Sequence, residues 1–239
     1  MTLRVKVDKL NVRSGPGTGY EIVAQLGFGD LVEPVETAGW LPVELGDGTV
    51  GWVAERYLEK LSESVDQDVQ AIVEECRLQG LDLPAQIAYV LATVEWETNR
   101  TFKPVREAYW LSEDWRKLNL RYYPYYGRGY VQLTWGDNYR RYTERLRSRF
   151  PERAGQIDLV AEPDQALIPE YARFILVDGF KTGAFTGKKL PDYVNEDRTD
   201  FLNARRCINR LDRADKIASL AEKWLSRLEG RDGGSGENG

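Results

Sequence analysis

Two glutamates in one stretch of the chain are candidates for acid–base chemistry. Glu97 follows an apolar run beside Trp96, and Glu107 comes ten positions later within PVREAYW. A carboxyl group at the end of a buried helix is partly desolvated, which suits a general acid, whereas a wetter carboxylate in a loop can activate water. Enzymes that hydrolyse glycosidic bonds use such a pair of carboxyl groups. The simpler alternative is two ordinary solvated glutamates.

Aromatic residues are dense around these two glutamates. Between positions 102 and 135 the sequence contains ten of them: Phe102, Tyr109, Trp110, Trp115, Tyr122, Tyr123, Tyr125, Tyr126, Tyr130 and Trp135. Sugar rings stack on aromatic faces, so this density favours a saccharide groove, although aromatic residues also pack cores. Residues 100–153 carry 13 Lys and Arg against 6 Asp and Glu. This local charge either attracts an anionic polymer such as a bacterial wall or marks a solvated helix face.

The motif YGRGYVQLTWGDNY is a second candidate site. Gly127 and Gly129 allow close backbone approach or positive φ. Gln132 and Thr134 alternate with apolar residues, so an extended stretch would point both polar side chains the same way. Asn138 adds another amide. One face of this stretch can therefore meet a ligand or a water, but a strand with a polar solvent face explains the pattern equally well.

The composition excludes several kinds of site. The chain has 239 residues, no His and only two Cys, Cys76 and Cys207. Without imidazole there is no Ser-His-Asp triad, Cys-His pair or HExxH zinc site. Two cysteines cannot form a disulfide framework or a zinc site, and both lie on apolar helical faces, where we expect packed thiols. We therefore expect any proton chemistry to come from carboxylates, Tyr, Lys or Cys, with no metal and no cofactor.

Charge and hydropathy exclude other partners. The 33 Lys and Arg against 38 Asp and Glu leave a net charge of −5, so no global basic field argues for nucleic acid. No apolar run approaches the length of a membrane span, and the first residues, MTLRVKVDKLNV, lack the apolar core of a signal peptide. We expect no nucleic-acid or membrane partner. Nothing in the sequence specifies an oligomer, and we expect a monomer.

The candidate residues must be positioned by the second of two domains. Residues 1–60 alternate short β-forming runs with turn signals such as SGPGTG, which predicts a small all-β barrel. From residue 64 the apolar period becomes helical, and residues 64–229 have the size of one mostly α-helical domain. Residues 230–239 are polar and Gly-rich, and we expect a disordered tail. The predicted fold class is therefore α+β.

Caps and breakers predict the helix boundaries. Ser62 or Ser64 begins the first helix and Gly80 ends it. Pro84 opens a second helix that is apolar nearly all round and should be the buried central helix. Residues 99–133 lack a helical period and form a long irregular segment, which is usually functional in compact domains. Further helical segments are predicted at 135–149, 163–182 and 199–228.

These motifs together resemble the family 19 glycoside hydrolases, the chitinase and phage-endolysin group, over residues 64–229. WET at 96–98 is similar to the family's His-Glu-Thr, and PVREAYW places Glu107 where the endolysin-like branch has its second glutamate. YGRGYVQLTWGDNY is similar to the family's GRG…Q-[LI]-[ST]…N-Y signature. FTGKKLPDY and NARRCINR resemble later segments of the family.

The resemblance implies a lysozyme-like or chitinase-like domain that hydrolyses β-1,4 bonds next to N-acetylglucosamine-type sugars with inversion. Glu97 would protonate the leaving oxygen, and Glu107 would activate a water with help from Thr134. The residues expected to contact substrate are Trp110, Arg128, Tyr130, Gln132, Asn138 and Asn209. Inversion requires the two carboxyl groups to lie about 6.5–9.5 Å apart, which leaves room for the water.

Two positions depart from the family pattern. Trp96 stands where the family usually has His, which removes a polar neighbour of Glu97. Arg210 follows Asn209 where the family often has Gly, which weakens the assignment of Asn209.

Residues 1–60 resemble a bacterial SH3-like module. LNVRSGPGTGYEIVAQLGFGD, a GW pair at 39–40 and GWVAERYLE occur in that family's usual order. Such modules accompany wall-lytic enzymes, so the resemblance implies peptidoglycan binding. The aromatic candidates for a ligand surface are Tyr20, Trp40, Trp52 and Tyr57, and the two tryptophans fit a core equally well.

Three functions remain open at this point. The first is a wall-lytic glycoside hydrolase that acts on peptidoglycan, with the N-terminal module as its anchor. The second is the same chemistry on chitin, and the third is a glycan-binding protein whose hydrolase domain has lost activity. The substrate lies outside the cytoplasm while no export signal is visible, so the location of the protein stays open between phage-lysin-like release and export without a cleaved signal.

Overall fold

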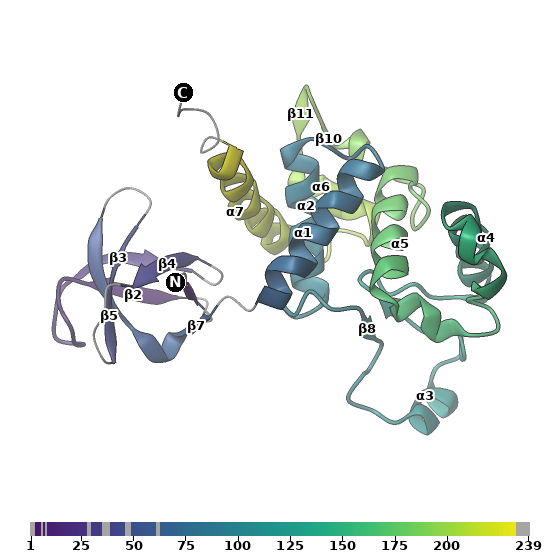
Figure 1. Ribbon diagram of the computed structural model, residues 1–239, viewed down its shortest axis with the longest axis horizontal. Coiled ribbons are helices and arrows are strands. Elements are labelled where there is room, and N and C mark those ends of the chain that lie inside the picture. The colour runs from purple at the N-terminus through teal and green to yellow at the C-terminus, as the bar shows by residue number, and fades with distance from the viewer. Residues whose placement is uncertain are drawn as a thin grey trace. The chain divides into compact units, whose positions relative to one another are not determined.

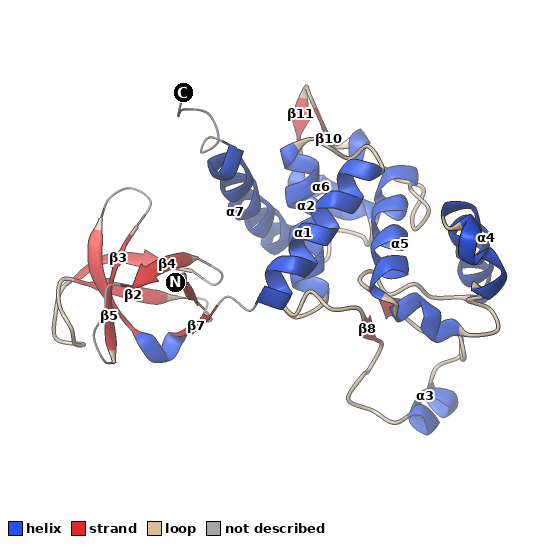
Figure 2. Cartoon of the chain, in the orientation of Figure 1, coloured by secondary structure: helices blue, strands red, loops and turns tan. Residues whose placement is uncertain are grey.

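The chain divides into two compact units, Met1–Asp66 and Gln67–Gly239. The computed structural model describes residues 3–5, 7, 9–27, 30–34, 39–45, 49–60 and 63–232. Strands dominate the first unit and helices dominate the second, which also contains two short strand pairs (Figure 2). An antiparallel sheet is thus followed by a mostly helical region, which confirms the predicted α+β class.

The first unit is built from one antiparallel sheet. Its described strands are β1 (Leu3–Val5), β2 (Leu10–Arg13), β3 (Ile22–Leu26), β4 (Leu31–Pro34), β5 (Trp40–Glu44), β6 (Val50–Ala54) and β7 (Leu58–Lys60). They pair in the order β3-β2-β6-β5-β4-β1-β7, and a 3-10 turn at Glu55–Tyr57 leads into the last strand. The short strands and turn signals of the sequence therefore predicted this unit correctly.

Alternating side chains build the core of this sheet. β2 buries Leu10 and Val12 while their neighbours face outward, because successive side chains of a strand point to opposite faces. The core cluster consists of Leu3, Val5, Leu10, Val12, Leu26, Val32, Leu41, Val43 and Val53. Gly51 permits the close approach of β6 to β2, since a Cβ there would overlap Cγ1 of Val12.

The second unit is a helical assembly with two short strand pairs (Figure 1). Its helices are α1 (Glu63–Leu78), α2 (Pro84–Glu97), α3 (Glu113–Asn119), α4 (Gly136–Arg149), α5 (Pro169–Thr182), α6 (Phe201–Ala204) and α7 (Ala214–Asp232). Its strand pairs are β8 (Val105–Arg106) with β9 (Arg128–Gly129) and β10 (Val194–Asn195) with β11 (Arg198–Thr199). Short 3-10 helices cover Pro151–Gln156, Pro163–Leu167, Leu190–Asp192 and Arg205–Cys207.

Helix α2 is the central helix of this unit, as its sequence predicts. Pro84 occupies the first helical turn, where its missing N–H costs nothing. Every residue from Gln86 to Glu95 is buried, and α7 is the helix that packs against α2 most extensively. Gly80 follows α1 with a φ of +78°, which confirms it as the residue that stops that helix. The end of α2 is thereby held rigidly, and Glu97 is its last residue.

Several predicted boundaries are wrong in detail. The irregular segment contains α3, whose start is capped by Ser112 accepting a hydrogen bond from the Trp115 N–H at 3.2 Å. The expected helix at 163–182 breaks before Pro169, which cannot continue a helix from its N-terminal side. The expected helix at 199–228 divides into α6, a 3-10 turn and α7. Helix α7 extends through the first three residues of the predicted tail, and residues 233–239 lie outside the described part of the chain.

Backbone strain is concentrated between the end of α2 and the start of α4. Among the described residues, seven non-glycine residues have a positive φ, and six of them lie in this segment: Asn99, Arg100, Phe102, Ala108, Gln132 and Trp135. Positive φ is costly for residues with a side chain and tends to persist at functional sites, where the surrounding structure enforces it. The segment that the sequence marks as irregular is therefore also the most strained.

In the part of the chain that the structure describes, no helix combines the length and apolarity that a membrane crossing requires.

Candidate active site

Glu107 lies just after β8, and its carboxylate is held by two donors. The Tyr122 hydroxyl donates to Oε1 at 2.6 Å, and the Gly127 N–H donates to Oε2 at 2.9 Å. The backbones of Glu107 and Gly127 are also hydrogen-bonded, because the Glu107 N–H donates to the Gly127 carbonyl at 2.8 Å. Both carboxylate oxygens are thus fixed in direction, while the residue stays partly exposed.

A buried arginine supports the loop that carries Glu107. Arg116 of α3 donates to the carbonyl oxygens of Glu107 and Ala108, at 2.9 Å each, and pairs with Glu113 at 3.0 Å. Ala108 itself has a φ of +48°, so the chain turns sharply directly after the glutamate. Helix α3 therefore acts as the anchor for this turn, a role that the sequence did not predict.

The phenol of Tyr122 remains a donor over a wide pH range. Desolvation, together with the hydrogen bond to Glu107 and the charge of that carboxylate, raises the pKa of Tyr122 to about 12. The neutral phenol is therefore the form that meets Glu107.

Gln132 lies in a tight turn, and the prediction of an extended stretch there is wrong. Arg128 and Leu133 exchange backbone hydrogen bonds of 3.2 and 2.8 Å, so the chain reverses between them. Gln132 takes a φ of +54° within this turn and folds its side chain over Gly127. A Cβ at Gly127 would lie 2.5 Å from the Gln132 Oε1 atom. The turn thus places the amide next to the backbone that holds Glu107.

Thr134 and Asn138 continue the same cluster. The Thr134 hydroxyl donates to the Gln132 carbonyl at 2.7 Å, and the Asn138 amide donates to the Thr134 carbonyl at 2.8 Å. Since its proton is engaged with the backbone, the Thr134 oxygen presents lone pairs to a water or ligand. Four of the predicted site residues are therefore linked by contacts: Glu107, Gln132, Thr134 and Asn138.

Two other residues of the motif are structural in this fold. The Arg128 side chain is 4% exposed, pairs with Asp164 at 2.7 Å and lies 3.7 Å from the centre of the Tyr126 ring. Tyr130 is fully buried and donates to the Phe102 carbonyl at 3.3 Å. Both were expected to contact substrate, but burial removes them from direct contact because their polar atoms face protein groups. They instead support the turn from behind.

Glu97 forms a second cluster at the end of α2. Its side chain is 22% exposed, and its Oε1 lies 2.9 Å from Nη1 of Arg205, whose side chain is 4% exposed. Nη1 makes no hydrogen bond, so this contact is an ion pair without hydrogen-bond alignment. Arg205 also donates through Nε to the Asp212 carbonyl at 3.0 Å. No sequence signal singled out Arg205, which lies within the NARRCINR segment.

The surroundings of Glu97 place the remaining candidates. Asn209 is exposed, its N–H donates to the Arg205 carbonyl at 3.0 Å, and its side-chain oxygen accepts from the Arg210 N–H at 2.8 Å. Trp96 points outward, with 36% of its surface exposed and the Lys216 ammonium 5.6 Å from its ring centre. The Trp96 indole is therefore not buried over Glu97.

Exposed aromatic rings lie beside Glu107. Tyr109 and Trp110 are 66% and 72% exposed and meet edge to face at 5.2 Å. Trp135 is 47% exposed, and its ring lies 5.1 Å from that of Tyr122. Large aromatic faces in contact with water are available for stacking against a ligand.

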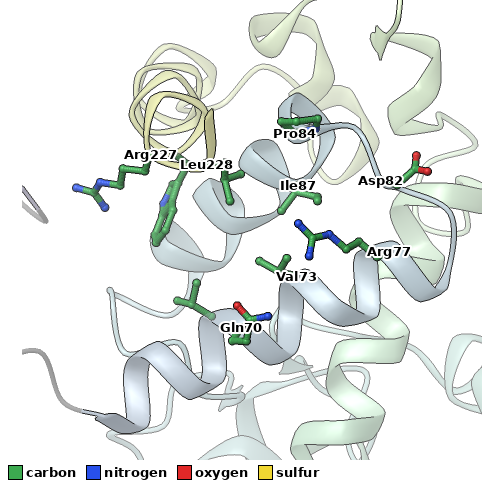
Figure 3. A pocket seen from close by; sticks show the side chains of 10 residues that line it. Gln70, Val73, Arg77, Asp82, Pro84, Ile87, Arg227 and Leu228 are labelled. Atoms are coloured by element: carbon green, nitrogen blue, oxygen red, sulfur yellow. The ribbon is translucent and has the colours of Figure 1, made fainter. Parts of the chain in front are cut away.

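A cavity of about 200 Å³ lies apart from both glutamates, between α1, α2 and α7 (Figure 3). Its lining is formed by Val69, Gln70, Val73, Arg77, Asp82, Pro84, Ile87, Trp224, Arg227 and Leu228. It contains none of the predicted site residues.

The cysteines are packed thiols, as expected. Cys76 and Cys207 are both buried and free. Burial raises the pKa of Cys76 far above its ordinary value and that of Cys207 to about 12, so both stay protonated. Within the described residues, no three Cys, Asp or Glu side chains gather closely enough to hold a metal ion.

The first unit offers separate aromatic candidates. Tyr20 is 50% exposed beside the turn that Gly15 and Gly17 form against its ring. Trp40 and Trp52 are half-buried, and Tyr57 packs against the core. Trp40 also lines a surface hollow of about 370 Å³ together with Gly39, Ala54, Glu55 and Arg56.

Comparison with known proteins identifies the first unit. The protein-family model for the bacterial SH3 domain matches residues 8–59, which confirms the SH3-like assignment. Over 57 residues the chain is 37% identical to the "Putative N-acetylmuramoyl-L-alanine amidase YrvJ" of Bacillus subtilis (strain 168). That match covers 23% of this chain and 11% of the relative, so the chain matches about a tenth of the relative's length.

Proposed function

We propose that this chain is a cell-wall hydrolase that cleaves β-1,4 glycosidic bonds in polymers containing N-acetylglucosamine. Bacterial peptidoglycan is the proposed substrate, and chitin is the alternative. The bacterial SH3 domain at residues 8–59 supports association with peptidoglycan. The hydrolase activity itself is proposed from the second unit.

The observation that carries the proposal is the environment of Glu107. Its carboxylate is oriented by the Tyr122 hydroxyl and the Gly127 N–H, and it is partly exposed beside exposed aromatic rings. A fixed carboxylate, a hydroxyl oxygen with free lone pairs and sugar-stacking faces are what water activation at a saccharide requires.

The proposed reaction is a single displacement. A water attacks the anomeric carbon, Glu107 takes the water's proton, and Thr134 accepts a hydrogen bond that orients the water. The bond between that carbon and the glycosidic oxygen breaks as Glu97 donates a proton to the leaving oxygen, which gives products with inverted configuration. Gln132, Asn138, Asn209 and Trp110 would hold the sugars.

Arg205 has a defined part in this scheme. The ion pair holds the ionised carboxylate of Glu97, the form left after proton donation, at the end of α2, next to a guanidinium that is itself buried. Arg205 therefore acts as a positioning residue, because it holds the acid without touching the substrate in the proposed reaction.

Product analysis tests the proposal directly. The full chain is incubated with purified peptidoglycan and, separately, with chitin hexamer, and products are identified by mass and by newly formed reducing ends. Sugar fragments with new reducing ends are expected. Release of free stem peptides from intact glycan strands would instead favour amide cleavage, the activity in the name of the relative that matches the first unit. Binding without any product would favour a glycan-binding protein.

A further inference from the structure

We infer that Arg121 and Trp135 form a subsite for a carboxylate-bearing sugar beside Glu107. The inference rests on the proposed function and deepens it, because it makes the catalytic unit select acidic saccharides over neutral ones. None of the residues expected to hold substrate supplies a free positive charge at this point, since Arg128 is buried.

Three contacts connect this subsite to the reacting carboxylate. The Tyr122 hydroxyl lies 2.6 Å from Glu107, and the Tyr122 ring lies 5.1 Å from the Trp135 ring. The Arg121 guanidinium carbon lies 5.2 Å from the centre of the same indole. Trp135 is also held at a φ of +75°, which is unusual for a bulky residue. The Tyr122 side chain therefore connects the Trp135 indole to Glu107, and the fold holds Trp135 in its unusual backbone conformation.

The charge of Arg121 is uncompensated. Arg121 is exposed, and among the described residues it makes no hydrogen bond or ion pair with an acidic side chain. Asp137, two positions after Trp135, pairs with Arg140 at 2.7 Å instead. The positive charge of Arg121 also acts on the Tyr122 phenol. It lowers the pKa of Tyr122, whereas burial and the hydrogen bond to Glu107 raise it. An anion that binds here gains a partner without breaking an existing ion pair.

The chemistry of this pair matches an acidic sugar. An indole face stacks on the apolar face of a sugar ring, and a guanidinium held over an indole keeps its N–H groups free for a carboxylate. Chitin is uncharged along its length. The sugars of peptidoglycan carry lactyl carboxyl groups or peptides that end in carboxylates, so the subsite discriminates between the two polymers by charge.

Substitution of Arg121 tests the inference. We expect Arg121→Gln to lower kcat/KM for soluble peptidoglycan fragments with free carboxylates by about tenfold, the effect of losing a hydrogen bond to a charged group. Turnover of neutral chitin hexamer should change less than about twofold, since no charged contact is lost there. Arg140→Gln is the matched control, because it removes an exposed arginine that already has a partner. That variant should leave both substrates unaffected.

The outcomes separate the inference from the proposed function. An equal loss on both substrates, or no loss on either, overturns the subsite while leaving the hydrolase intact. If the unmodified chain hydrolyses neither substrate, the proposed function fails, and calorimetric binding decides the subsite. In that case the acidic fragments must bind more tightly than chitin hexamer, and Arg121→Gln must abolish the difference; otherwise the subsite fails as well.

Discussion

The two candidate carboxyl groups are held in different ways, and the family resemblance gives them different proposed roles. Glu107 receives neutral donors, a phenol and a backbone N–H, and remains partly exposed. Glu97 meets a buried guanidinium instead. Neutral donors orient a carboxylate toward water, whereas an ion pair fixes a group at the end of a helix. Each role can therefore be tested by substitution at a single residue.

We expect Glu97→Gln to reduce hydrolysis of walls and chitin oligomers by about 10²–10⁴-fold while binding is retained, because the amide keeps the shape but cannot donate the proton that an acid would. Product formation and binding are measured on the same preparation. Glu144→Gln, an exposed change on α4, is the control and should retain full activity. Unchanged turnover in Glu97→Gln would remove this residue from the mechanism.

The two roles can be separated with a small anionic nucleophile. Azide needs no deprotonation, so we expect it to restore turnover in Glu107→Ala but not in Glu97→Gln. The product of rescue should be a glycosyl azide, which mass analysis identifies. Rescue of the Glu97 variant instead would reverse the assignment.

At the scale of elements, the turn between β9 and Leu133 brings the site together. The alternation of Gln132 and Thr134 with apolar residues is typical of a strand, but the hydrogen bonds of Arg128 with Leu133 reverse the chain. Positive φ at Gln132 is what allows its amide to lie over Gly127. A period of two in five residues cannot distinguish a strand from a tight turn, because both place polar groups at alternate positions.

We expect Gly127→Ala to destabilise the protein by about 1–3 kcal/mol and to lower activity, because its Cβ would displace the Gln132 amide. Urea unfolding gives the free energy, and hydrolysis assays give the activity. Gly155→Ala is the matched control, since no atom lies within 4 Å of the added Cβ. It should change stability by less than about 0.5 kcal/mol. Equal effects of the two substitutions would contradict the contact.

Buried tyrosines predict an alkaline limit to stability in the helical unit. Burial raises the pKa of Tyr130 and of Tyr139 to about 12. The pKa of such a phenol is higher in the folded state than its ordinary value of 10.0. Its contribution to the free energy of unfolding is therefore complete below pH 10.0. This contribution is lost as the pH rises through the folded pKa. The free energy of unfolding should therefore fall between about pH 10 and pH 12.

Tyr130→Phe isolates one of these groups. The variant keeps the buried ring and loses the hydroxyl's hydrogen bonds, one of 3.3 Å to the Phe102 carbonyl and one with Arg173, so it should fold. We expect its unfolding free energy to fall less steeply than that of the unmodified chain over the same pH range, measured by urea unfolding at each pH. Parallel curves for the two proteins would show that Tyr130 does not contribute.

At the scale of the whole molecule, the chain joins a bacterial SH3 domain to a helical unit with its own core. Each unit is compact by itself and carries its own exposed aromatic residues. Separate binding and cleaving units raise the local concentration of an enzyme on an insoluble polymer, which matters less for a soluble one.

We therefore expect residues 64–239 alone to hydrolyse soluble oligosaccharide at a rate within about twofold of the full chain. The same residues should lose most activity on whole cell walls, because an anchor raises the local enzyme concentration only on an insoluble substrate. Both rates are compared with those of the full chain, and sedimentation with walls measures binding. Circular dichroism of the shortened chain is the control for folding. Equal loss on both substrates would show that the first unit does not serve as an anchor.

The sequence by itself determined the two-part organisation, the alternating core of the sheet and the central helix opened by Pro84, and it predicted the two candidate glutamates. Each of these depends on local periodicity, on a breaker residue or on a short motif, and such signals are read within one element. Only the tertiary structure decided which side chains hold the glutamates. Arg205 meets Glu97 across more than a hundred positions, and Arg116 and Tyr122 fasten Glu107 through a short helix and a loop with no regular period. Contacts between distant segments depend on how helices pack, which no local pattern encodes.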